Sequence, residues 1–126
     1  MGNGTSLGRV RGLGSAHSGA HHWLLQRYTA VANLLGGLYL VFGLLRLSSY
    51  DYAAVHAWLH KPLPAVLVGM FVVSTFWHAR LGMTVLIEDY VHEHGNKFAV
   101  MTLLNLLSFA GGAFGLLCIV RIALGS

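Results

Sequence analysis

The sequence predicts an all-α integral membrane protein with three transmembrane helices packed as part of a heteromeric bundle. Three observations support this prediction: a low content of charge, a high content of apolar residues, and the gathering of those residues into three long stretches. Of the 126 residues, 56% are hydrophobic and only 10% are charged, whereas ordinary soluble domains carry about 25% charged residues. A single small domain with so little charge cannot cover an apolar core with polar surface. The same composition excludes intrinsic disorder.

The three apolar stretches span about residues 28–45, 63–87 and 98–120. The first and the third contain no charged residue, and His78 and Arg80 interrupt the second. A membrane-spanning helix needs roughly 20 predominantly apolar residues. Because the backbone must satisfy its own hydrogen bonds in lipid, helices are the form expected for such runs. Each stretch is therefore predicted to cross the membrane once.

The polar ends of the chain predict its organisation and its orientation. Residues 1–22 read as a polar, glycine-rich, basic leader, which precedes a three-helix anchor over residues 23–126. The leader lacks the features of a signal peptide and of an Arg- and Ser-rich transit peptide, which favours a bacterial inner membrane. Basic residues near the helix ends favour a cytoplasmic N-terminus, by five against three. On the outer side, residues 52–60 are expected to form a short interfacial helix.

His78 is the most informative polar residue because it lies close to the middle of the second stretch, where an unmatched polar group is costly. Ser74 and Gly82 share its helix face, and the glycine leaves room beside the imidazole. This spacing suits a flat macrocycle, and neutral histidine is an axial ligand of haem iron. A hydrogen-bonded core histidine is the other interpretation. The other histidines lie outside the stretches, so a second haem ligand would come from another subunit.

Charged and aromatic residues also stand at the inner ends of the first two stretches. Glu88, Asp89 and Tyr90 are either a solvated helix end or a site at which the phenol donates a hydrogen bond to a lipophilic carbonyl substrate. A neighbouring carboxylate would then hold a cationic partner. Arg27, at the start of the first stretch, is either a positive-inside anchor or the partner of an anion such as a haem propionate.

Further residues have helix-packing interpretations. Arg80 is expected either to snorkel inward or to pair within the bundle. Asn105 is expected to form an interhelical hydrogen bond, and Gly111 and Gly115 form a GxxxG face for close packing. The single cysteine, Cys118, excludes an intrachain disulfide and a CxxC metal site.

The runs from His78 to Met83 and from Ile87 to Val91 resemble the second span of the hydrophobic membrane anchor subunit of succinate dehydrogenase, respiratory complex II. Gly14 to Ala16 and Gln26 to Ala32 resemble the leader and first-span entry of that family. The family pattern is a histidine, a glycine four residues on, and Asp-Tyr eleven and twelve residues on, all of which are present here. The other membrane anchor of the complex, here called the sister anchor subunit, has a serine-and-arginine quinone signature that is not evident in this sequence.

The resemblance implies a role for each matching residue. His78 would be one axial ligand of haem b and its iron, with the other ligand supplied by the sister anchor subunit. Tyr90 would hydrogen-bond ubiquinone, Asp89 would hold a basic group of the sister anchor subunit, and Arg27 would lie near the haem propionates. The chain would contain no dicarboxylate site and no catalytic residue of its own.

The implied function is that of a non-flavin subunit of succinate dehydrogenase, in the tricarboxylic acid cycle and in electron transport. Its expected partners are the sister anchor subunit, the iron–sulphur subunit that passes electrons to quinone, the flavoprotein indirectly, and the lipid bilayer; no nucleic-acid partner is expected. The alternative is a haem-free structural or assembly subunit, in which His78 is a packed polar residue. A small transporter is a weaker interpretation because no internal repeat is visible.

Overall fold

The computed structural model describes residues 16–125, so most of the predicted leader lies outside the described residues. The described part consists of one short and three long helices: α2 (Ala16–Leu45), α3 (Tyr52–Leu59), α4 (Pro62–Tyr90) and α5 (His94–Ala123). The three long helices are each long and apolar enough to cross a membrane, over Gly19–Leu45, Pro62–Tyr90 and His94–Ala123. These findings confirm the all-α prediction with three candidate transmembrane helices. The short helix expected near residues 52–60 is also present as α3.

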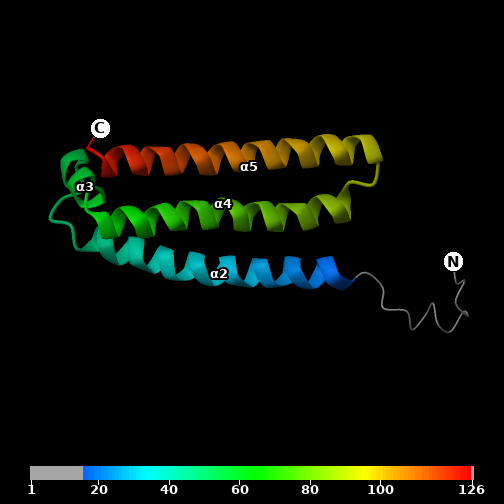
Figure 1. The fold of residues 1–126 in the computed structure, drawn as a ribbon, viewed down its shortest axis with the longest axis horizontal. Helices are drawn as coiled ribbons and strands as arrows, with labels where there is room; N and C mark the ends of the chain where they lie inside the picture. Colours follow the sequence, from blue (N-terminus) through cyan, green and yellow to red (C-terminus); the bar gives the residue numbers. More distant parts are fainter. Residues whose placement is uncertain (1–15, 126) are drawn as a thin grey trace, which may run out of the picture.

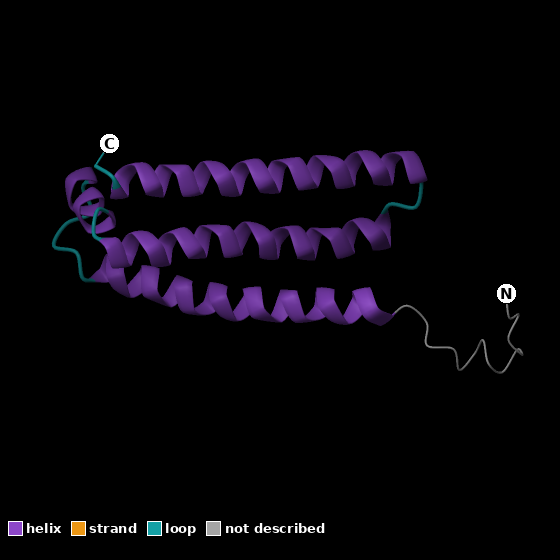
Figure 2. Cartoon of the chain, viewed as in Figure 1, coloured by secondary structure: helices purple, strands orange, loops and turns teal. Residues whose placement is uncertain are grey.

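The three long helices run side by side with α4 in the middle (Figure 1). Helices α2 and α5 both pack against α4, and α3 lies across one end of the bundle, whereas the α4–α5 loop closes the other end (Figure 2). A row of three helices cannot enclose a core of its own. Within the described residues, the buried ones all belong to α4: Pro64, Ala65, Val68, Gly69, Leu81 and Ile87. The outer helices leave most of their apolar surface for lipid or for other subunits.

Two side-chain contacts hold helix α3 in place, one at each of its ends. Asp51 is the N-cap of α3, and its Oδ1 accepts a hydrogen bond of 2.7 Å from the backbone N–H of Ala54. That bond favours the charged carboxylate and lowers the pKa of Asp51 below its usual value. A contact of 3.0 Å between His60 Nδ1 and the carbonyl oxygen of Ile122 ties the end of α3 to the last turn of α5. Helix α3 is thereby held against the end of the bundle.

Glycines set the spacing between α4 and α5. Phe76 packs over Gly111, and a Cβ added at Gly115 would lie 2.7 Å from Cγ1 of Val72. Both aromatic and aliphatic side chains of α4 therefore occupy space that only glycine leaves free on α5. This contact confirms the packing role predicted for the GxxxG face and identifies α4 as its partner.

Filling this close contact should destabilise the bundle. Gly115→Leu is expected to lower the free energy of unfolding by about 1–3 kcal/mol, the usual cost of overpacking, because the added side chain meets Val72. Thermal unfolding of the detergent-solubilised complex measures this change. Gly19→Leu is the matched control, since nothing lies within 4 Å of a Cβ at that position. Equal losses in the two variants would contradict the packing role of Gly115.

Candidate functional site

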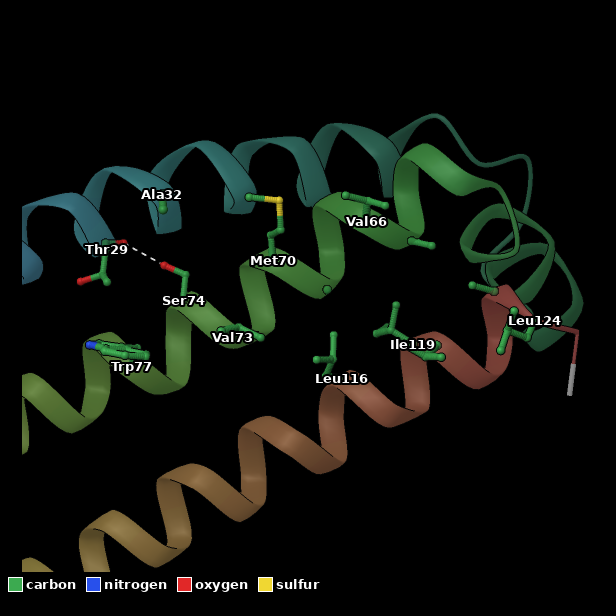
Figure 3. A pocket seen from close by; sticks show the side chains of 14 residues that line it. Thr29, Ala32, Val66, Met70, Val73, Ser74, Trp77, Leu116, Ile119 and Leu124 are labelled. Carbon is green, nitrogen blue, oxygen red and sulfur yellow. Dashed lines mark hydrogen bonds between the residues drawn. The ribbon is translucent and has the colours of Figure 1, made fainter.

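His78 lies on the face of α4 that packs against α2, where it is half-buried. Its Nδ1 atom is 2.9 Å from Oγ1 of Thr29 on α2. One turn earlier on the same face, the hydroxyl of Ser74 donates a hydrogen bond of 3.2 Å to the backbone carbonyl of Thr29, shown as the dashed line in Figure 3. Two polar side chains of α4 thus converge on a single residue of α2. The sequence predicts the face shared by Ser74, His78 and Gly82, but it does not identify Thr29 as the partner of that face.

The hydrogen bonds of Thr29 favour one neutral tautomer of His78. The carbonyl oxygens of Leu25 and Gln26 lie 2.8 Å and 3.1 Å from the Thr29 hydroxyl, which donates its single hydrogen to them. When the hydroxyl donates to either carbonyl, its oxygen is left to accept, and His78 then donates its Nδ1–H. In this neutral tautomer the lone pair is on Nε2. Among residues 16–125, Nε2 of His78 has no hydrogen-bond partner.

Gly82 differs from the glycines that pack helices together. A Cβ at Gly82 would meet only the amide nitrogen of Gln26, at 3.9 Å. At Gly115, by contrast, the same atom would press on Val72. The space beside Gly82, one turn from His78, is therefore left open by the described chain. His78 thus has an available Nε2, a hydrogen-bonded Nδ1 and an open position one turn away. This arrangement suits an axial ligand of haem iron.

Asp89 and Tyr90 are the last residues of α4, at the end of the bundle opposite α3. Both side chains are exposed, and Tyr90 retains 78% of its accessible surface. Twelve residues separate Tyr90 from His78, which corresponds to about 18 Å of helix rise. The structure therefore places the predicted quinone residues next to each other but well apart from His78, as two separate areas on one helix.

Arg27 lies deeper in the bundle than the sequence indicates. It is expected to open the first span, but α2 begins at Ala16, so Arg27 is about 16 Å along the helix. It is two residues before Thr29 and thus close to the level of His78 rather than of Tyr90. Its guanidinium carbon lies 5.3 Å from the ring centroid of Trp23, a cation–π contact. The apolar signal does not reveal the early helix start because His21, His22, Gln26 and Arg27 flank the short apolar run at residues 23–25.

The remaining surface near the site is apolar. A groove of about 640 Å³ runs between α2, α4 and α5 towards the α3 end, with Thr29 and Ser74 near its inner limit (Figure 3). Its other lining residues are apolar, and they include Met70, Trp77 and Leu116. Within the described part of the chain, no group of three or more His, Cys, Asp or Glu side chains could hold a metal ion.

The fold and this site define a class: a helical membrane subunit with three candidate membrane-spanning helices, whose outer two leave most of their apolar surface exposed. The family described as succinate dehydrogenase/fumarate reductase transmembrane subunit matches residues 1–112. The chain belongs to this family. Within it, the chain is similar to hydrophobic membrane anchor subunits of succinate dehydrogenase, and in that role it is one component of a multi-subunit oxidoreductase in the membrane.

Three relatives illustrate the similarity, and each is described as a succinate dehydrogenase hydrophobic membrane anchor subunit. The protein of Rickettsia conorii is 36% identical over 99 residues, which cover 78% of this chain and 79% of the relative. That of Rickettsia felis is 35% identical over 107 residues, with coverages of 85% and 81%. That of Paracoccus denitrificans is 27% identical over 118 residues, with coverages of 93% and 90%. The similarity therefore extends over about four fifths or more of the length of each of these anchors.

Proposed function

We propose that this chain supplies one axial ligand of a haem b through Nε2 of His78, and that the sister anchor subunit supplies the other. The observation that carries the proposal is the hydrogen bond from His78 to Thr29, because it leaves Nε2 as the free lone pair. The opening at Gly82 supports it. When bound, haem supplies one-electron redox chemistry. The chain's own residues hold and orient the ligand.

The exposed end of α4 forms part of the proposed ubiquinone-reduction site. There the Tyr90 hydroxyl donates a hydrogen bond to a quinone carbonyl, and Asp89 holds a basic group of the sister anchor subunit beside the quinone. Arg27 pairs with a propionate of the haem, which is consistent with its position near the level of His78. The proximity of two adjacent exposed polar side chains at a helix end supports this assignment.

The proposed site implies an orientation and a set of partners. The N-terminus is cytoplasmic in a bacterial inner membrane, and the Tyr90 end of the bundle faces the iron–sulphur subunit. The flavoprotein oxidises succinate to fumarate, and the iron–sulphur subunit passes the electrons to quinone at this end. The bacterial relatives and the excess of basic residues on the N-terminal side support this arrangement.

Substitutions of Thr29 test the proposal at the hydrogen bond that carries it. Thr29→Val should leave Nδ1–H of His78 without an acceptor, which lowers the basicity of the ligand. We expect a higher midpoint potential of the haem and about 10–100-fold weaker haem retention. Thr29→Ser keeps the hydroxyl and should restore both. Redox titration of the b-type absorption in the purified complex measures the effect.

Thr75→Val is the matched control because the Thr75 hydroxyl on α4 hydrogen-bonds the carbonyl of Phe71 and Oδ1 of Asn33 on α2 without contacting His78. It should leave the potential unchanged. If Thr29→Val and Thr75→Val shift the potential equally, or if Thr29→Ser behaves like Thr29→Val, the orienting role of Thr29 is wrong. A haem-free structural subunit would give no b-type signal in any of these variants.

A further inference from the structure

Arg80 is a half-buried cation without an anionic partner among residues 16–125. Its Nε–H donates a hydrogen bond of 2.6 Å to Oδ1 of Asn105 on α5, which is its partner among the described residues. The nearest acidic residue along α4 is Glu88, about 12 Å further along the helix. The sequence contains four acidic side chains, all of them near the two ends of the bundle: Asp51, Glu88, Asp89 and Glu93. The positive charge of Arg80 is thus not neutralised by the chain itself.

The guanidinium lies deep in the bundle rather than at its edge. Arg80 is ten residues before the end of α4 at Tyr90, and Asn105 is eleven residues after the start of α5 at His94. These separations correspond to about 15–16 Å of helix rise from the same end. Helical side chains tilt towards the helix N-terminus, which in α4 is the α3 end, so Arg80 leans away from the nearer boundary. Its contact with Asn105 at that depth shows that it does not snorkel to the Tyr90 end.

Arg80 and Asn105 together present hydrogen-bond donors that the described chain leaves available. Asn105 uses its oxygen to accept from Arg80, so its remaining polar group is the amide NH₂. Arg80 keeps four N–H groups, and a guanidinium has no acceptor. Both residues line a groove of about 720 Å³ between α4 and α5, here called the Arg80 groove. The rest of its lining is mainly aromatic or small and includes Phe76, Trp77, Phe109, Gly112 and Ala113.

We propose that a carboxylate on a membrane-spanning helix of another subunit enters the Arg80 groove and pairs with Arg80 and Asn105. A carboxylate supplies the missing charge and accepts from the guanidinium in two parallel bonds. The inference rests on membership in a multi-subunit membrane complex and is independent of the proposed haem and quinone roles. Arg80 is about 200° around α4 from His78, so it faces α5 and not the face on which His78 meets Thr29. Its position about 15 Å from the Tyr90 end of α4 favours a carboxylate on a membrane-spanning helix over a lipid phosphate.

Cross-linking in the intact complex tests the proposal directly. Arg80→Lys places a primary amine in the groove, and a membrane-permeable carbodiimide couples an amine to an adjacent carboxylate. We expect a covalent link between residue 80 and an acidic residue within a span of another subunit, identified by mass spectrometry. The wild-type complex and Arg80→Ala should give no such link. A link only to Glu88, a lipid adduct, or no link at residue 80 would overturn the proposal.

A second experiment does not depend on the folding of the lysine variant. Arg80→Leu leaves the partner's carboxylate buried and unpaired, so we expect at least about a tenfold weaker association of this chain with the complex. Replacing the matching acid by its neutral amide should restore assembly. That acid is found by changing each Asp and Glu within the spans of the other membrane subunits to Asn or Gln, one at a time. If none of these changes restores the Arg80→Leu complex, the groove does not hold a carboxylate.

Discussion

His78→Ala is expected to abolish the b-type haem signal of the assembled complex. The substitution removes the donor nitrogen that we assign to the iron, and among residues 16–125 no cluster of metal-ligating side chains offers a replacement. The reduced-minus-oxidised spectrum of the complex, co-expressed with its membrane partner and purified in mild detergent, measures the loss. Because His78 is half-buried and bonded to a single residue of α2, the three-helix bundle itself should persist.

Two comparisons separate ligand loss from general misfolding. Ser74→Ala removes a hydrogen bond to the same residue of α2, Thr29, without removing a ligand, and it should retain the haem. Free imidazole added to His78→Ala should restore part of the b-type absorption, because it fills the position of the missing ring. A b-type spectrum that survives unchanged in His78→Ala would refute the ligand assignment.

Tyr90→Phe is expected to lower quinone reduction by about tenfold, the effect of losing one useful hydrogen bond at about 1.4 kcal/mol. Succinate oxidation with an artificial acceptor that bypasses the membrane should stay at the wild-type rate. Tyr90 is 78% exposed in this chain, so the loss of its hydroxyl should not disturb the packing of α4. Parallel assays of the two activities in the same preparation measure the difference.

Tyr52→Phe is the matched control, since Tyr52 is also a tyrosine at a helix end and is 81% exposed, but it begins α3 at the opposite end of the bundle. Quinone reduction should be unchanged in this variant. An equal loss of both activities in Tyr90→Phe would indicate that the residue serves assembly rather than quinone binding. An unchanged rate of quinone reduction would contradict the role of the phenol.

The membrane spans were predictable because lipid imposes a simple rule on sequence. Apolar runs of sufficient length must become helices, and all three predicted runs lie within observed helices. The helix starts were less predictable. Helix α2 begins at Ala16, twelve residues before the first apolar run at Tyr28, and its candidate span begins at Gly19, because helical hydrogen bonding continues through polar residues that interrupt the apolar signal. Hydropathy indicates which segments are apolar enough to lie in lipid, but it does not show at which residue the helical hydrogen bonding begins.

The site was predictable only along a single helix. Helical periodicity placed Ser74, His78 and Gly82 on one face, and the structure has Ser74 and His78 meeting α2 together. The partner, Thr29, depends on how two helices fit side by side, and one sequence does not specify that register. Asn105 was expected to bond between helices, and it does so with Arg80. Arg80 was expected either to snorkel inward or to pair within the bundle. The register of α4 against α5 decides between these outcomes, because it brings Arg80 to Asn105.

Haem binding by this chain through His78 can be tested without any substitution, in the wild-type complex. The measurement is a reduced-minus-oxidised spectrum, with haem quantified against this chain in the purified complex. We expect a b-type spectrum with one haem for each copy of the chain, because a single histidine of this subunit shares the haem with a second subunit. A purified, active complex without b-type absorption would contradict haem binding by His78.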